Sequence, residues 1–168
     1  MIRVAAPSDV DAIARLHVKT WQAAYRGHMP DAHLDALDPS RRAATWSKAI
    51  VQPATLVLVA TTGETLVGFC SLLPSRDADA TPVIGEIAAI YVDPSFWRCG
   101  FGSALIEAIV ESARARNFAE TTLWVLTHNA AARAFYEARG FKSDGHTKTD
   151  ERQGFALHET RYRRHIAV

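Results

Sequence analysis

The chain has 168 residues, of which 48% are hydrophobic, and it carries a formal net charge of +1 at pH 7. This length and composition predict a single domain over residues 1–168 with one sizeable apolar core. The small net charge argues against nucleic acid as a partner, and no apolar run reaches the roughly 18 residues of a membrane span, so we expect neither nucleic acid nor membrane as a partner.

The first third of the chain is predicted to form one short strand and then helices. Residues 2–5 alternate as a strand does, and the start lacks the charged and apolar regions of a signal peptide, which predicts a cytoplasmic protein. Apolar residues from Val10 to Trp21 keep to one helix face. A loop is expected over 25–30. A second helical region follows over 31–36 and 39–50, with Pro39 in a favourable first-turn position.

The middle of the chain changes to an extended pattern. Residues 55–60 and 66–73 are predicted strands joined by the turn Thr62-Gly63-Glu64. The small and polar residues 74–82 predict a loop. A third strand over 83–92 is apolar on both faces, as expected of a central strand. It leads through a proline-marked turn and two glycines into a helix over 100–116.

The last third is predicted to begin with a buried strand over 121–126. Asn129 then caps a helix that ends near Arg139, and Gly140 stops it. An extended segment begins at Phe141, followed by a polar loop over 144–154 and a last strand over 155–163. The order β-α-α-β-β-β-α-β-α-β-β predicts an α/β fold with a mixed central β-sheet flanked by helices. Strands 83–92 and 121–126 should be parallel neighbours through a right-handed crossover.

The cysteines and histidines indicate no metal centre. Cys70 and Cys99 form no CxxC pair, and free thiols are expected. The seven histidines have no metal-ligand spacing, so no metal cofactor is expected.

The most informative feature is the strand over 83–92 that leads through two glycines into the helix over 100–116. Backbone N–H groups at the start of that helix are unpaired, and the helix dipole adds partial positive charge at the same point. Residues 86–105 therefore predict an anion site, most simply for a phosphate or pyrophosphate.

Two motifs in this chain resemble those of the GNAT family, the acyl-CoA-dependent N-acetyltransferases. The residues Tyr91-Val92-Asp93-Pro94 … Gly100-Phe101-Gly102 … Leu105 are similar to the family's pyrophosphate loop, (Arg or Gln)-x-x-Gly-x-(Gly or Ala). Residues 129–141 are similar to its Asn … Phe-Tyr-x-x-x-Gly-Phe signature. Trp97 stands where the family usually has Arg or Gln, with Arg98 adjacent. The resemblance spans almost the whole chain and implies the GNAT fold.

The resemblance implies acetyl-CoA as cosubstrate, lying between the two central strands. Its pantetheine arm would pair with the backbone of Ile90, Tyr91 and Val92 as an added strand. Asn129 would hold the other side of the cleft. The pyrophosphate would sit on the loop formed by Arg98, Cys99, Gly100, Phe101, Gly102 and Ser103, where the glycines remove side chains that would block it.

Two side chains are the candidate catalytic groups. Tyr136 would protonate the CoA thiolate as the C–S bond breaks, although it could also be a plain core aromatic. Glu86 would remove a proton from the attacking ammonium, directly or through water. Glu86 could equally be a solvent-exposed residue at the beginning of its strand. In an unbroken strand, Glu86 shares a face with Ala88, Ile90 and Val92.

The acceptor is an amine that the sequence leaves open, either a small molecule or a peptide. Trp21, Tyr25 and Arg26 fall where the family builds its acceptor pocket, and half-buried packing would explain Trp21 equally well. The resemblance is also compatible with a homodimer. The predicted activity is transfer of acetyl from acetyl-CoA to a primary amine by direct attack in a ternary complex. The alternative is a non-catalytic acyl-CoA-binding or sensing module.

Overall fold

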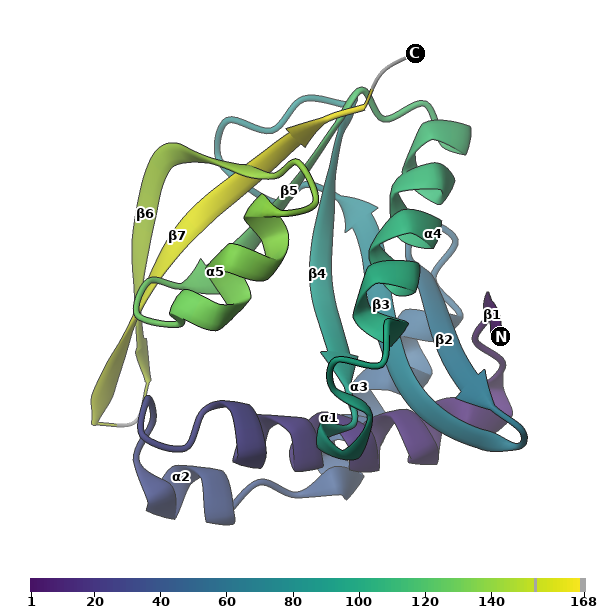
Figure 1. Ribbon diagram of the computed structural model, residues 1–168, viewed down its shortest axis with the longest axis vertical. Helices are drawn as coiled ribbons and strands as arrows, with labels where there is room; N and C mark the ends of the chain where they lie inside the picture. The colour runs from purple at the N-terminus through teal and green to yellow at the C-terminus, as the bar shows by residue number, and fades with distance from the viewer. Residues whose placement is uncertain (153, 167–168) are drawn as a thin grey trace.

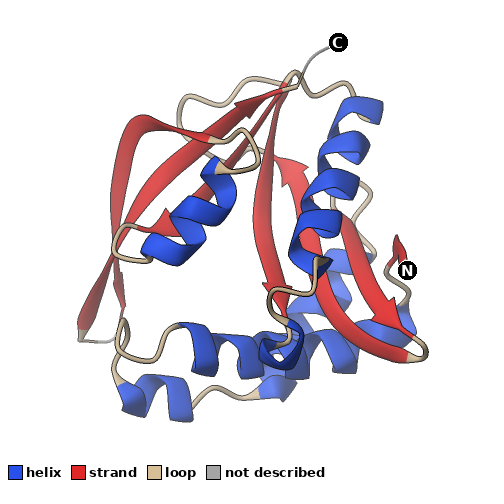
Figure 2. Cartoon of the chain, in the orientation of Figure 1, coloured by secondary structure: helices blue, strands red, loops and turns tan. Residues whose placement is uncertain are grey.

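The computed structural model of the protein describes residues 1–152 and 154–166, which form a β-sheet with helices on both faces (Figures 1 and 2). The predicted α/β class with a mixed sheet is confirmed. The strands and helices are β1 (Ile2–Val4), α1 (Val10–Ala24), α2 (Asp31–Asp35), α3 (Pro39–Ile50), β2 (Leu56–Thr62), β3 (Thr65–Pro74), β4 (Ile84–Val92), α4 (Phe101–Ala115), β5 (Glu120–Leu126), α5 (Ala130–Glu137), β6 (Lys142–Arg152) and β7 (Phe155–His165).

The strands lie in the order β1-β2-β3-β4-β5-β7-β6. Among the strand pairs of the described residues, β4–β5 alone is parallel, as the crossover through α4 predicts. This pairing is short, because it joins Ile84, Gly85 and Glu86 to Glu120, Thr121 and Thr122 and then stops. Beyond that point the two strands diverge (Figure 1).

Alternation along the strands distributes the core between two layers. In β2, Leu58 and Ala60 pack into the core beneath α4, whereas Val57 and Val59 pack against α1 and α3. The helices α4 and α5 cover the face turned to the viewer in Figure 1, and α1 and α3 lie on the other side. Among the described residues, no helix combines the length and apolarity that crossing a membrane requires.

A β-bulge in β4 corrects one prediction. Ile87 pairs with Leu72 and Ala89 pairs with Ser71, so Ala88 has no partner on β3. Because of this extra residue, Ile87 and Ile90 both pack into the core beneath α4. Glu86 precedes Ile87 and therefore points to the opposite face. The expected shared face of Glu86 with Ile90 and Val92 is wrong, since it required an unbroken strand.

The polar segment after Ser143 is also corrected. It was predicted as a loop over 144–154, but residues up to Arg152 belong to β6, which pairs antiparallel with β7 at the end of the sheet. An edge strand whose side chains are mostly in water shows little apolar alternation, so its sequence resembles a loop. Gln153 lies outside the described residues.

Candidate active site

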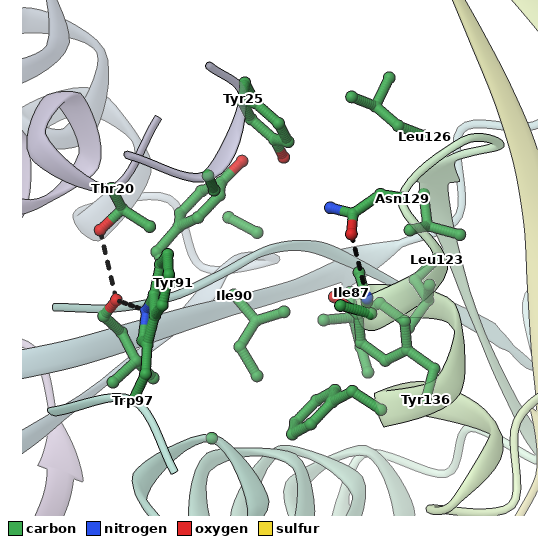
Figure 3. A pocket seen from close by; sticks show the side chains of 18 of the residues that line it. Thr20, Tyr25, Ile87, Ile90, Tyr91, Trp97, Leu123, Leu126, Asn129 and Tyr136 are labelled. Atoms are coloured by element: carbon green, nitrogen blue, oxygen red, sulfur yellow. Dashed lines mark hydrogen bonds between the residues drawn. The ribbon is translucent and has the colours of Figure 1, made fainter. Parts of the chain in front are cut away.

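A cavity of about 810 Å³ lies where β4 and β5 separate (Figure 3). Residues Ile87 to Val92 of β4 form one wall and Leu123 to Leu126 of β5 form the opposite wall. The C-terminal end of α1, the N-terminal end of α4 and one face of α5 complete the lining. The bulge at Ala88 ends the β4–β5 ladder, so the backbone of β4 beyond it faces the cavity without a neighbouring strand.

The loop before α4 presents backbone donors to one end of this cavity. Gly100 is the N-cap residue of α4 with φ of +85°, and no side chain caps the helix there. A Cβ on Gly100 would meet nothing within 4 Å. The first N–H groups of α4 therefore face open space next to the positive end of the helix dipole, which suits an anion. Arg98, with φ of +61°, stores backbone strain in the same loop.

The predicted pyrophosphate residues divide into two groups. Arg98, Gly100, Gly102 and Ser103 line the cavity. Phe101 instead packs into the core beneath α4. Cys99 is exposed outside the cavity lining, and its thiol contacts the backbone oxygen of Trp97 at 3.5 Å.

Arg139 also lines the cavity, although the sequence does not predict it as a site residue. Its guanidinium stacks 3.8 Å from the ring centre of Phe135 and donates hydrogen bonds to the Phe135 carbonyl and to the Ser103 hydroxyl. Its Nε is buried without a hydrogen-bond partner. A positive charge is thereby fixed beside the uncapped end of α4. Arg139 falls on one of the unspecified positions (x) of the Phe-Tyr-x-x-x-Gly-Phe signature, so the signature predicts no role for it.

Trp97 ties the loop to the end of β4. Its indole Nε1 donates to the Val92 carbonyl at 2.7 Å, and Thr20 of α1 approaches the same oxygen at 3.5 Å (Figure 3). The indole at this unusual motif position therefore fixes the mouth of the cavity.

Three tyrosines surround the centre of the cavity, Tyr25 from the end of α1, Tyr91 from β4 and Tyr136 from α5 (Figure 3). Burial raises the pKa of Tyr136, and the nearby Tyr91 raises it further. Burial likewise raises the pKa of Tyr25 and of Tyr91. All three phenols therefore keep their protons at ordinary pH and can donate hydrogen bonds.

Asn129 caps α5 as predicted, because its side-chain oxygen accepts from the Ala132 N–H at 3.1 Å. It also lines the cavity opposite β4. Gly140, with φ of +80°, ends the turn after the helix as expected.

Glu86 is buried outside the cavity lining, with 5% of its surface exposed. Its carboxylate is held by Arg76 in the β3–β4 loop, with Nη2 to Oε1 at 2.5 Å and Nε to Oε2 at 3.1 Å. The backbone N–H of Arg76 adds a third bond at 3.2 Å. The catalytic role of Glu86 therefore stays a prediction, and any such role has to operate against this ion pair.

The three predicted acceptor residues have different environments. Tyr25 lines the cavity, whereas Trp21 is buried beside it in the cluster that joins the α1–α2 corner to β5 and β7. Arg26 lies outside the lining, is exposed and pairs with Asp31 and Asp35. Trp124 on β5 also lines the cavity, and no motif in the sequence predicts this role. Only the divergence of β4 and β5 exposes it.

A buried ionic network holds the Trp124 ring. Its Nε1 donates to Asp77 at 3.0 Å, and Asp77 accepts from Arg161 of β7 at 3.0 Å. Arg161 is 1% exposed and also binds Asp79 and Asp144 at 2.7 Å each. A buried charge is tolerated only when it is paired in this way.

The chain is similar to known acetyltransferases in sequence and in fold. A model of the Acetyltransferase (GNAT) family matches residues 11–141. A probable N-acetyltransferase of Mycobacterium tuberculosis is 27% identical over 150 residues, covering 88% of this chain and 83% of that protein.

Solved structures of acetyltransferases share the fold of this chain. The PaiA N-acetyltransferase of Thermoplasma acidophilum, in complex with coenzyme A, has a TM-score of 0.80 at 18% identity and covers 98% of both chains. A putative acetyltransferase of Salmonella typhimurium, with its cofactor acetyl-CoA, has a TM-score of 0.76 at 22% identity, covering 100% of this chain and 94% of the other.

Proposed function

The chain belongs to the Acetyltransferase (GNAT) family and is an acetyl-CoA-dependent N-acetyltransferase. From this premise we propose that it transfers the acetyl group to a primary amine by direct attack in a ternary complex. The observation that carries the proposal is the open β4–β5 cleft, which connects the uncapped N-terminus of α4 to a chamber lined by tyrosines.

The residues present fit acetyl-CoA. The backbone of Ile90, Tyr91 and Val92 lies along the cavity, where the pantetheine arm would add as a strand. The loop from Arg98 to Ser103 would bind the pyrophosphate through N–H groups. The charge of Arg139, with its unpartnered Nε, supports the same anion site from the turn that follows α5.

Tyr136 is the proposed acid. Because burial keeps its pKa raised, the phenol stays protonated and can donate to the thiolate that leaves when the C–S bond breaks. Glu86 is retained as the candidate base, acting through water. Its carboxylate lies on the far face of β4 from Ile90, and the ion pair with Arg76 weakens it as a base. For the compartment we propose the cytoplasm, supported by two free thiols, of which Cys99 is exposed.

The test is the Tyr136→Phe variant, assayed by thiol release across a panel of small amines and a peptide. We expect kcat to fall on the order of a hundredfold, because the proton donor is lost, with binding of acetyl-CoA in calorimetry changed by less than about twofold. The control is Tyr162→Phe. This tyrosine is also buried, but its hydroxyl bonds Arg133 and Glu137 away from the cavity.

Full turnover by Tyr136→Phe would remove the acid role. Failure of the folded wild type to bind acetyl-CoA would defeat the proposed function itself.

A further inference from the structure

Beside the cavity, Lys148 lies in a site whose side chains are of the kinds that bind organic cations. The Lys148 ammonium lies 4.3 Å from the ring centre of Trp124 and 3.5 Å from a carboxylate oxygen of Glu159. An aromatic face and a carboxylate together are the usual partners of an organic cation. We refer to Trp124 and Glu159 as the cation cradle.

The cradle is built on three neighbouring strands. Glu159 of β7 pairs directly with Lys148 of β6 on one side and with Leu126 of β5 on the other. Trp124 precedes Leu126 by two residues, so its side chain leaves β5 on the same face. Because Trp124 itself lines the cavity, the cradle adjoins the proposed acceptor chamber.

The Trp124 ring is held in place, and the Glu159 side chain is more buried than that of Lys148. The Trp124 ring is held at its Nε1 by Asp77, which Arg161 anchors in turn. The Glu159 side chain is 20% exposed, whereas the Lys148 side chain is 45% exposed. An exposed lysine ion pair contributes only about 0.2–1 kcal/mol, so a competing cation can displace it. The cradle therefore combines an anchored ring and a mostly buried carboxylate with a more exposed lysine that a ligand can replace.

The field of Glu159 also reaches the chamber. Burial is the main cause of the raised pKa of Tyr25 and of Tyr91, and the negative charge of Glu159 raises both by less than the neighbouring side chains change them. Both phenols line the cavity. The Glu159 carboxylate therefore lies near groups that line the chamber without lining it itself.

We propose, building on the proposed acetyltransferase function, that the cation cradle receives a second, non-reacting ammonium group of the acceptor in place of Lys148. The amine that attacks must be neutral, so a charge that remains bound during the reaction belongs to another group of the same molecule. The substrate class is therefore a small diamine or polyamine, of which one amino group is acetylated and another stays protonated in the cradle.

The kinetic test compares acceptors of equal carbon number, namely diaminobutane, butylamine and aminobutyrate. In the wild type we expect the highest kcat/KM for diaminobutane and the lowest for aminobutyrate, whose carboxylate Glu159 repels. Glu159→Gln should lower the preference for diaminobutane over butylamine by about fivefold, the scale of one exposed ion pair. Lys148→Met should lower the KM for diaminobutane a few-fold, because the competing ammonium is gone. The control is Glu151→Gln, an equal loss of charge at an exposed position of β6.

A binding test separates this proposal from the acetyltransferase function. Diaminobutane is titrated into Lys148→Met while the indole N–H signals of the four tryptophans are followed by NMR, with Trp124 assigned by Trp124→Phe. We expect the Trp124 signal to shift, and to stay unchanged in the Lys148→Met/Glu159→Gln double variant.

Equal shifts in both proteins, or a diamine preference that is the same in wild type and Glu159→Gln, would overturn the cradle. Absence of thiol release with every amine would count against the acetyltransferase function, and the titration would still decide the cradle.

Discussion

The imidazole of His17, beneath the cavity, shows how a single buried residue sets pH dependence. Its Nδ1 accepts from the Trp46 indole at 3.0 Å, and its ring stacks 4.9 Å from that of Tyr91. The accepting Nδ1 places the proton of the neutral ring on Nε2. Burial lowers the pKa of His17 to about 3 from 6.5, with a smaller effect from Arg42. The folded protein therefore keeps His17 neutral under acidic conditions in which the unfolded chain protonates it.

This difference in protonation makes the stability of the protein depend on pH. Between pH 6.5 and about 3 the unfolded state binds one more proton than the folded state at His17, so stability falls as the pH falls. The His17 contribution to the loss approaches about 1.4 kcal/mol per pH unit. Urea unfolding of wild type and His17→Gln, which retains an acceptor for Trp46, should give curves of stability against pH that diverge over this window. Parallel curves would contradict the buried neutral imidazole.

Residue-level inference from the sequence succeeded where a motif defines a backbone role. Asn129 as a cap and Gly140 after the helix followed from local rules alone. The orientation of Glu86 did not, because a bulge at Ala88 depends on the neighbouring strands rather than on Ala88 itself. Arg139 and Trp124 were missed because long-range packing alone brings them to the cavity.

At the scale of elements, the turn from β4 into α4 has a left-handed backbone conformation at the position where the ligand is proposed to bind. Gly100 has a left-handed conformation, and the space where its Cβ would lie is open. Under the proposed function this space belongs to the pyrophosphate. A methyl group there would both strain the backbone and obstruct the ligand.

Gly100→Ala is therefore expected to raise the KM for acetyl-CoA on the order of tenfold, while unfolding free energy falls by about 1 kcal/mol. The control is Gly145→Ala in β6, where φ is +86° and a Cβ would also meet nothing within 4 Å. It should lose similar stability and keep its KM. Steady-state kinetics with denaturant unfolding measures both. Equal KM values in the two variants would exclude a binding role for the space at Gly100.

The elements differed in how far the sequence predicted them. The strands β2, β3 and β5 and the helix α4 were predicted within a few residues, because each buries an apolar pattern of clear period. The strand β6 was not, since its strand pairing and its ion pairs to β7, such as Lys148 with Glu159, replace apolar burial. Backbone pairing leaves no signature in side-chain hydrophobicity.

At the scale of the whole molecule, Arg161 connects segments far apart in the sequence. It joins β7 to the β3–β4 loop through Asp77 and Asp79 and to β6 through Asp144. The hydrogen bond from Arg161 lowers the pKa of Asp79. These contacts brace the sheet around the β4–β5 divergence, where backbone pairing is missing.

Arg161→Met should lower the free energy of unfolding by about 3 kcal/mol, because it leaves clustered carboxylates without their cation. Urea denaturation measures the loss. Arg164→Met is the control on the same strand. Its guanidinium lies over the Phe141 ring, and its loss should cost about 1 kcal/mol or less. A cost for Arg161→Met no greater than that of Arg164→Met would show that the network does not stabilise the fold.

The short β4–β5 ladder has a consequence for cooperativity. In the described part of the chain, the ladder between β4 and β5 covers three residue pairs, from Ile84 and Glu120 to Glu86 and Thr122, and backbone hydrogen bonds from Ala119 and Glu120 to Val83 extend it on one side. Opening free energies differ across a protein, and a line of few hydrogen bonds is where partial opening costs least. A ligand that bridges this line binds the closed form alone and so raises its stability through mass action. The cleft that would receive the cosubstrate thus lies along the line where we expect the sheet to open most easily. There the bound cosubstrate would pair with β4 as an added strand.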